Sequence, residues 1–292
     1  MADTKIPLEP PPNYDDAAAE HGTPAAPMAK PLPRGTFPLD IPVLTQLRGK
    51  RVVLASASPR RKQLLGQACV STPLPLLPTP NPPPLAANPG IGLTNIEITP
   101  STKPENLDKV ALGAFDYVLR TAQKKCLDVY QTLLANSMKS IPDPTMVIAA
   151  DTVVVTAAGR ILEKPRSEAE HLAMLRMLRD QVTHKVYTAV CVLVPRDDAR
   201  APGYNMESSV EETKVVFDET TSDEFISAYV KTREAVGMAG GYGIQGMGGL
   251  LVDRIEGAYD NVVGLPLRAT LALMEKTLFM QGSDDEDEDE EE

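Results

Sequence analysis

The segment from Val52 to Leu65 most constrains how this chain can fold, because it predicts a buried strand followed directly by a helix. Residues 52–55 are apolar and indicate a short strand. Ser58 and Pro59 are typical of a helix start, with serine at the N-cap and proline at the first helical position. The helix that follows has an apolar side at Leu64 and Leu65.

Three cations occupy the first turn of this predicted helix: Arg60, Arg61 and Lys62. The helix dipole is already positive there, so each placement costs roughly 0.3–1 kcal/mol. A bound anion would reverse the sign, because free backbone N–H groups and basic side chains would converge on it. The alternative is that all three side chains extend into water and bind nothing.

Strands and helices intermix along the rest of the chain without strict alternation. We expect strands over 91–98, 145–155, 160–164, 186–194, 208–217 and 250–255, and helices over about 105–136, 168–179, 223–229 and 267–280. This order predicts an α/β fold with a mixed sheet and flanking helices.

Proline and charge mark the segments that we expect outside the folded core. Residues 1–42 are proline-rich and predicted to be disordered, and residues 71–90 form a proline-rich surface insertion within one domain spanning 43–282. Residues 283–292 form a disordered acidic tail. Because nine acids lie in that tail, the remainder of the chain is almost neutral, which argues against nucleic acid as a partner.

The composition also indicates the cellular compartment of the protein. No apolar run approaches the ~20 residues that a membrane span needs, so we expect no membrane partner. The first residues lack the pattern of a secretory signal. Cys69, Cys126 and Cys191 are scattered, which suggests reduced thiols rather than a disulfide framework or a zinc site. We therefore expect a cytoplasmic protein.

Asp151 interrupts the most apolar run of the chain, residues 147–155. An ionised carboxylate is costly there unless it meets a cation, a metal or hydrogen-bond donors. If Ala158 and Gly159 form a two-residue hairpin turn, Lys164 faces Val153 and shares a face with Asp151. The pair would then line one pocket wall; the alternative is an ion pair that only fixes the hairpin.

Residues 240–249 are glycine-rich and formally satisfy G-x-G-x-x-G. A helical pattern precedes them and a strand follows, which is the reverse of a dinucleotide-binding site. The Gln245 side chain can offer a hydrogen-bond donor and an acceptor to the edge of a nucleobase. The alternative is that the segment is simply a mobile turn. Together with the basic helix start and Asp151, this favours an anion or nucleotide site with a general base or a metal.

Five segments, in this order, resemble the Maf family of nucleoside triphosphate pyrophosphatases, and the resemblance covers roughly residues 50 to 280. They are Leu54–Arg61, Ala150–Thr152, Leu162–Pro165, Gly241–Gly246 and Asn261–Pro266. The resemblance implies a two-lobed fold like that of the inosine triphosphatases, with a central nucleotide cleft. It also implies cleavage of a nucleoside triphosphate to monophosphate and pyrophosphate, a divalent metal (Mg²⁺ or Mn²⁺), and a homodimer.

The resemblance assigns roles to matching positions. It implies phosphate binding by Arg61, Lys125 and Lys164, with Ser56 and Ser58 in the same site. It makes Asp151 the general base, and Glu105 and Asp151 the metal ligands.

The resemblance also links three further residues, Arg60, Thr152 and Gln245, to the choice of substrate. They resemble the branch that acts on dTTP and UTP, and we extend this to modified pyrimidine nucleotides. Two alternatives stay open: a 7-methyl-GTP pyrophosphatase, and a non-catalytic nucleotide-binding regulator linked to cell division. The second is motivated by Gly237 and Met238, which stand where the family usually has an aspartate and a lysine.

Overall fold

A computed structural model describes residues 39–66, 91, 93, 96–136, 141–196 and 203–279. The predicted N-terminal disorder up to residue 38, the 71–90 insertion and the acidic tail lie outside these residues. No helix in the described part of the chain is long and apolar enough to cross a membrane.

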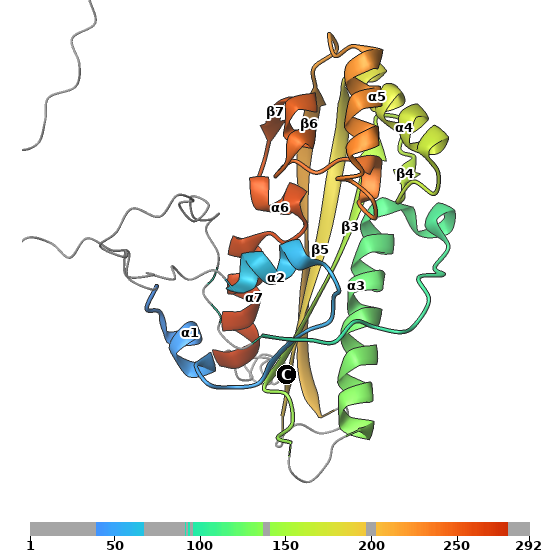
Figure 1. Cartoon of the computed structure of the whole chain (residues 1–292). Coiled ribbons are helices and arrows are strands. Elements are labelled where there is room, and N and C mark those ends of the chain that lie inside the picture. Colours follow the sequence, from blue (N-terminus) through green and yellow to red (C-terminus); the bar gives the residue numbers. More distant parts are fainter. Residues whose placement is uncertain are drawn as a thin grey trace, which may run out of the picture. The chain divides into compact units, whose positions relative to one another are not determined.

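A seven-stranded mixed sheet forms the centre of the fold, in the order β2-β1-β3-β5-β6-β7, with β4 pairing to β3 (Figure 1). β1 runs parallel to β2 and β3, and the other pairs are antiparallel. The strands are β1 Val52–Leu54, β2 Ile96–Ile98, β3 Met146–Thr156, β4 Ile161–Leu162, β5 Thr183–Pro195, β6 Tyr204–Phe217 and β7 Val252–Glu256. This confirms the predicted α/β fold with a mixed sheet.

Helices cover both faces of the sheet. They are α1 Pro42–Leu47, α2 Pro59–Gly66, α3 Lys109–Ala135, α4 Glu168–Asp180, α5 Asp223–Thr232, α6 Tyr259–Val263 and α7 Leu267–Phe279, with short 3₁₀ turns at Ala239–Gly241 and Met247–Leu251. The long helix α3 packs on one face, while α1, α2 and α7 lie at one end of the other face and α4 and α5 at its far end (Figure 1).

The alternation of side chains along β3 explains this division. Residues at odd positions, such as Ala149 and Val153, pack in the core under α3. On the opposite face, Ala150 belongs to the core shared with α2 and α7, whereas Val154 belongs to the core shared with α4 and α5. Thr152 lies between these two cores. One continuous strand therefore passes from the lobe around α2 and α7 to the lobe around α4 and α5.

Polar side chains continue this boundary across the sheet. Thr152 and Thr188 are paired between β3 and β5, and their Oγ1 atoms lie 3.0 Å apart. The Thr188 hydroxyl also donates to the Asn261 carbonyl oxygen at 2.9 Å. The Asn261 amide nitrogen in turn donates to the Val186 carbonyl oxygen at 3.2 Å. We call Thr152, Thr188 and Asn261 the polar seam.

The predicted hairpin register is wrong by one residue. Val154 pairs with Leu162 and Val155 with Ile161, so the turn contains three residues rather than two. Gly159 adopts a φ of +80°, which a three-residue turn needs at its last position. Because β4 ends at Leu162, Lys164 does not face Val153 within a ladder.

The predicted helix over 105–136 also begins later than expected. Asp108 caps α3, accepting hydrogen bonds from the backbone N–H groups of Val110 and Ala111 at 2.9 and 3.1 Å. Glu105 therefore lies in the segment before the helix. Gly113, with a φ of +69°, provides the break expected within it.

Candidate active site

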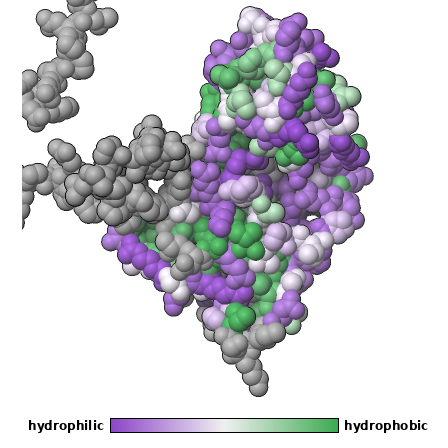
Figure 2. All heavy atoms as spheres, in the orientation of Figure 1, coloured by the Kyte–Doolittle hydropathy of each residue, from purple (hydrophilic) through white to green (hydrophobic). Residues whose placement is uncertain are grey.

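A cavity of about 860 Å³ lies between the two lobes, where β3 meets α2, α3 and the glycine-rich segment. Hydrophilic surface surrounds a hollow in the middle of the face shown in Figure 2. The volume falls within the range of small-molecule and cofactor sites. All ten residues singled out from the sequence line it: Ser56, Ser58, Arg60, Arg61, Glu105, Lys125, Asp151, Thr152, Lys164 and Gln245.

Arg61 is held against the floor of the cavity by neutral acceptors alone. Its guanidinium donates to the Ser56 hydroxyl at 3.0 Å, the Ala150 carbonyl at 2.8 Å, the Gly264 carbonyl at 2.8 Å and the Thr152 hydroxyl at 2.9 Å. Burial lowers its pKa. Among the described residues it forms no ion pair, so its charge is available to an anion in the cavity.

The three cations at the start of α2 have different surroundings. Ser58 caps the helix by accepting from the Arg61 N–H at 3.5 Å, and the Ser56 hydroxyl accepts from the Ser58 N–H at 3.3 Å. Lys62 is exposed, whereas Arg60 and Arg61 line the cavity. Burial lowers the pKa of Arg60 as well. The alternative in which all three extend into water is therefore wrong.

Lys125 of α3 joins two carboxylates. Its Nζ lies 2.7 Å from Asp151 Oδ1 and 2.6 Å from Glu105 Oε1. Burial raises the pKa of Asp151, although the charges of Lys125 and Arg61 oppose the rise. Burial also acts to raise the pKa of Glu105, but the hydrogen bond and charge of Lys125 outweigh it and the pKa is lowered. The shared ammonium and the difference in burial therefore shift the pKa values of the two carboxylates in opposite directions.

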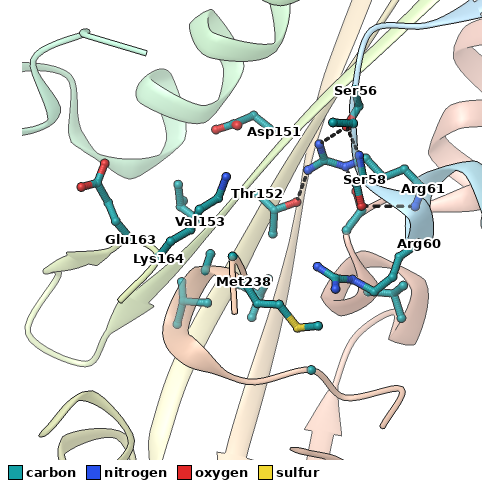
Figure 3. A pocket seen from close by; sticks show the side chains of 18 of the residues that line it. Ser56, Ser58, Arg60, Arg61, Asp151, Thr152, Val153, Glu163, Lys164 and Met238 are labelled. Atoms are coloured by element: carbon teal, nitrogen blue, oxygen red, sulfur yellow. Dashed lines mark hydrogen bonds between the residues drawn. The ribbon is translucent and has the colours of Figure 1, made fainter. Parts of the chain in front are cut away.

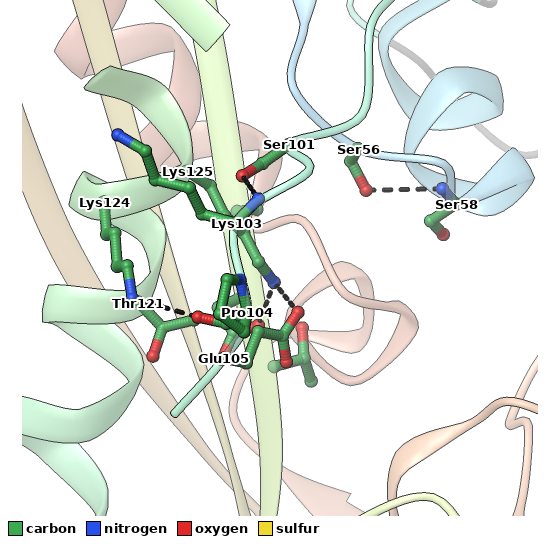
Figure 4. Close-up of polar contacts among 12 residues, drawn as sticks. Ser56, Ser58, Ser101, Lys103, Pro104, Glu105, Thr121, Lys124 and Lys125 are labelled. Atoms are coloured by element: carbon green, nitrogen blue, oxygen red, sulfur yellow. Dashed lines mark hydrogen bonds and ion pairs between the residues drawn. The ribbon is translucent and has the colours of Figure 1, made fainter. Parts of the chain in front are cut away.

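Helix α3 also holds the segment that presents Glu105 (Figure 4). Asp128, buried one turn beyond Lys125, accepts from the Ser101 hydroxyl at 2.6 Å. Lys124 donates to the Pro104 carbonyl oxygen at 2.9 Å. The chain that leads to the metal-ligand candidate Glu105 is thus tied to the same helix that carries Lys125.

The donor set suits a hard divalent cation. Glu105 and Asp151 direct carboxylate oxygens toward one positive centre, and Mg²⁺ is commonly bound by one or two carboxylates plus substrate phosphates. The described residues contain no group of three or more His, Cys, Asp or Glu that could hold a metal. A metal here would therefore take its remaining ligands from phosphate oxygens and water.

Lys164 reaches the cavity for a reason other than the predicted one. Since β4 ends at Leu162, the next two residues leave the ladder and both line the cavity. Glu163 forms ion pairs with Lys109 and, at 3.6 Å, with Arg166. Lys164 extends toward the Asp151 side of the cavity (Figure 3), and its charge contributes to lowering the pKa of Glu105.

The glycine-rich segment forms another part of the cavity wall. In Figure 3, Arg60 and Met238 lie on the side of Thr152 away from Asp151. Gln245 lines this part, and its Nε2 is buried without a hydrogen-bond partner among the described residues. The cavity thus combines a cluster of charged side chains around Asp151 with an unpaired amide at Gln245.

Comparisons with known proteins identify the family of this chain. A model of the Maf family (Maf-like protein) matches residues 51–277. The chain belongs to the Maf family. It is 40% identical to a dTTP/UTP pyrophosphatase of Schizosaccharomyces pombe over 253 residues, which covers 86% of this chain and 93% of the relative.

Two further Maf relatives span bacteria and animals. A dTTP/UTP pyrophosphatase of Clostridium botulinum (strain Eklund 17B / Type B) is 33% identical over 228 residues, covering 78% of this chain and 100% of the relative. A human protein named probable bifunctional dTTP/UTP pyrophosphatase/methyltransferase is 37% identical over 227 residues, covering 77% of this chain and 32% of the relative.

The sequence analysis of this Maf protein missed several polar residues around the cavity. Thr188 and Asn261 complete the polar seam, and Asp128 and Glu234 support cavity segments. Thr188 had a usable signal, as a polar residue within the apolar run 186–194, and Asn261 had one as the first residue of a segment that resembles the Maf family.

Proposed function

We propose that this chain hydrolyses dTTP and UTP, together with modified pyrimidine triphosphates, to the nucleoside monophosphate and pyrophosphate. The observation that carries the proposal is Asp151, a buried carboxylate of raised pKa beside Lys125, in a cavity that Arg61 and Lys164 also line. The relatives named dTTP/UTP pyrophosphatase support the same reaction and substrate.

In this proposal the triphosphate lies along the charged side of the cavity. Ser56 and Ser58 at the start of α2 offer hydroxyl groups, and Arg61, Lys125 and Lys164 offset the phosphate charge. Arg61 is already fixed by four hydrogen bonds, so little ordering is needed when the substrate binds.

Asp151 acts as the general base. It takes a proton from a water molecule, whose oxygen attacks the α-phosphorus, while the bond from that phosphorus to the bridging oxygen breaks. Pyrophosphate leaves with the electron pair, and the basic side chains stabilise its charge. A divalent cation held by Glu105 and Asp151 would neutralise phosphate charge when bound.

Gln245 accounts for the choice of base. Uracil and thymine present a carbonyl acceptor beside an N–H donor, and one amide can pair with both. The unpaired Gln245 Nε2 offers the donor. Arg60 and Thr152 are the other two residues that we assign to substrate specificity. The Thr152 hydroxyl accepts a hydrogen bond from Arg61.

A panel of triphosphates tests the proposal: dTTP, UTP, 5-methyl-UTP, CTP, GTP and 7-methyl-GTP, each with Mg²⁺ or Mn²⁺, with pyrophosphate release as the readout. We expect turnover of dTTP and UTP at least about tenfold faster than of CTP. Preferential turnover of 7-methyl-GTP would show that the chain is a 7-methyl-GTP pyrophosphatase instead. Tight nucleotide binding without turnover would instead support the non-catalytic regulator.

Two further parts of the proposal concern the state of the protein. We infer a reducing compartment, the cytoplasm, because Cys126 and Cys191 are both free thiols. We also infer a homodimer from the family resemblance, and light scattering at several protein concentrations tests it.

A further inference from the structure

We propose that Glu234 is a positioning residue that fixes the glycine-rich segment around Gln245, and through it the recognition of the nucleobase. This inference rests on the proposed function, in which Gln245 contacts the base. Glu234 follows α5 and lines the cavity. Its Oε2 accepts from the Met247 N–H at 2.8 Å, and its Oε1 accepts from the Gly248 N–H at 3.1 Å.

Tyr229 extends the same contact to the other side of Gln245. Its hydroxyl donates to Glu234 Oε1 at 3.1 Å and accepts from the Gly243 N–H at 3.2 Å. Burial raises the pKa of Tyr229, so the hydroxyl stays protonated and remains a donor. One carboxylate therefore ties down the backbone both before and after Gln245.

The glycines of this segment fit around the Glu234–Tyr229 pair. A Cβ on Gly246 would lie 2.5 Å from Glu234 Oε2, and a Cβ on Gly248 would lie 2.6 Å from the Tyr229 hydroxyl. Both distances are shorter than real Cβ contacts allow. Of the formal G-x-G-x-x-G pattern, Gly246 is thus explained by close approach to a carboxylate of the chain itself, whereas a Cβ on Gly241 would meet His171 and one on Gly243 would meet Met238.

The glycine-rich segment held by Glu234 contains one side-chain donor without a hydrogen-bond partner among the described residues. Gln245 Nε2 is buried and has no partner among the described residues, although neighbouring backbone N–H groups are satisfied. An unpaired buried donor carries a desolvation penalty that a hydrogen bond to a ligand would remove. Fixing the backbone on both sides holds Gln245 in the cavity wall, where a pyrimidine carbonyl oxygen would satisfy that donor.

A double-mutant cycle tests this with E234Q, Q245A and the combined variant, with the exposed Glu219 changed to Gln as the matched control. We expect E234Q to raise KM for UTP about tenfold with kcat within about threefold of wild type. Inhibition by inorganic tripolyphosphate, which has no base, should be unchanged. In the Q245A background, E234Q should change KM by less than about twofold. Equal effects in both backgrounds, or weaker tripolyphosphate inhibition, would overturn the proposal.

Amide hydrogen exchange provides a readout independent of turnover. We expect faster exchange at Gly243, Met247 and Gly248 in E234Q, and no change in E219Q. Unchanged protection at these amides would contradict the positioning role even if the enzyme is active. If wild type hydrolyses no triphosphate but the exchange differs, the proposed function fails and the anchoring by Glu234 stands.

Discussion

Lys125 and Asp151 form an ion pair in which Nζ and Oδ1 are 2.7 Å apart, and the two side chains are only 15% and 10% exposed. Glu105 contacts the same ammonium at 2.6 Å, with a side chain that is 47% exposed. The protonation of the candidate base therefore depends on a cation that it shares with the candidate metal ligand.

Replacing Lys125 by Gln should move the acid limb of the pH profile of kcat/KM to higher pH. Asp151 must be ionised to accept a proton, so activity rises as the pH increases through its pKa. Without Lys125, burial and the charge of Glu105 raise that pKa further. We expect the rate at pH 7 to fall about 10–100-fold, measured by pyrophosphate release between pH 5 and 9. The exposed Lys62→Gln is the control, and an unmoved acid limb would contradict the proposed coupling.

Asp151→Asn should abolish most activity without destabilising the fold. Loss of a general base typically lowers kcat about 10²–10⁴-fold. Because burial raises the pKa of Asp151, the folded protein binds more protons there than the unfolded chain, and ionised Asp151 costs stability above its ordinary pKa. The neutral amide avoids that cost, so the melting temperature at pH 8 should be equal or higher. Full turnover by the variant would show that another group is the base.

Gln245→Glu should shift the enzyme from uracil toward cytosine. A carboxylate accepts from the cytosine amino group but cannot donate to the uracil carbonyl oxygen. Because hydrogen bonds to charged groups contribute about 1.5–3 kcal/mol, the UTP/CTP ratio of kcat/KM should fall at least about tenfold. Competition between the two nucleotides measures the ratio directly, and an unchanged ratio would remove Gln245 from base recognition.

Asp128→Asn should loosen the segment that carries Glu105. Burial acts to raise the pKa of Asp128, but hydrogen bonds from Ser101 and Lys103 outweigh it and the pKa is lowered. The ionised carboxylate therefore stabilises the fold above its ordinary pKa, and this contribution is lost as the pH falls. We expect a loss of about 1–3 kcal/mol of unfolding free energy at pH 7, shrinking toward pH 3.

The same variant should require more Mg²⁺ for half-maximal activity, because Glu105 is less well placed. Metal binding followed by calorimetry provides a second measurement that does not depend on turnover. Asp116→Asn on the same helix is the matched control, and it should change neither stability nor metal affinity.

Local signals in the sequence predicted much of the fold. Helix α5 begins at Asp223 as predicted, with Ser222 as its cap accepting from the Phe225 N–H at 3.2 Å, and α4 spans nearly the predicted residues. The apolar run around Asp151 is a central strand, as its composition indicated. These features depend on neighbours along the chain, which is why they could be predicted.

Turn length, the start of a helix and contacts between distant segments could not be predicted in the same way. The register of β4 depends on one residue of turn length, and a positive φ at Gly159 decides it. The late start of α3 is fixed by Asp108, whose side chain accepts from the first backbone N–H groups of the helix. The role of Glu234 depends on a backbone segment more than ten residues away, and nothing in the local pattern signals that.

The polar seam has a mechanical consequence. Strands β3 and β5, of 11 and 13 residues, run without interruption beneath both lobes. Thr152 and Thr188 lie where these two strands pass from one lobe to the other. Rigid-body rotation of one lobe against the other would have to break or shear interstrand hydrogen bonds, since no flexible linker joins the lobes at this point. The width of the cleft is therefore set by the twist and stiffness of the sheet. Adjustment to different substrates is left to the segments at its rim.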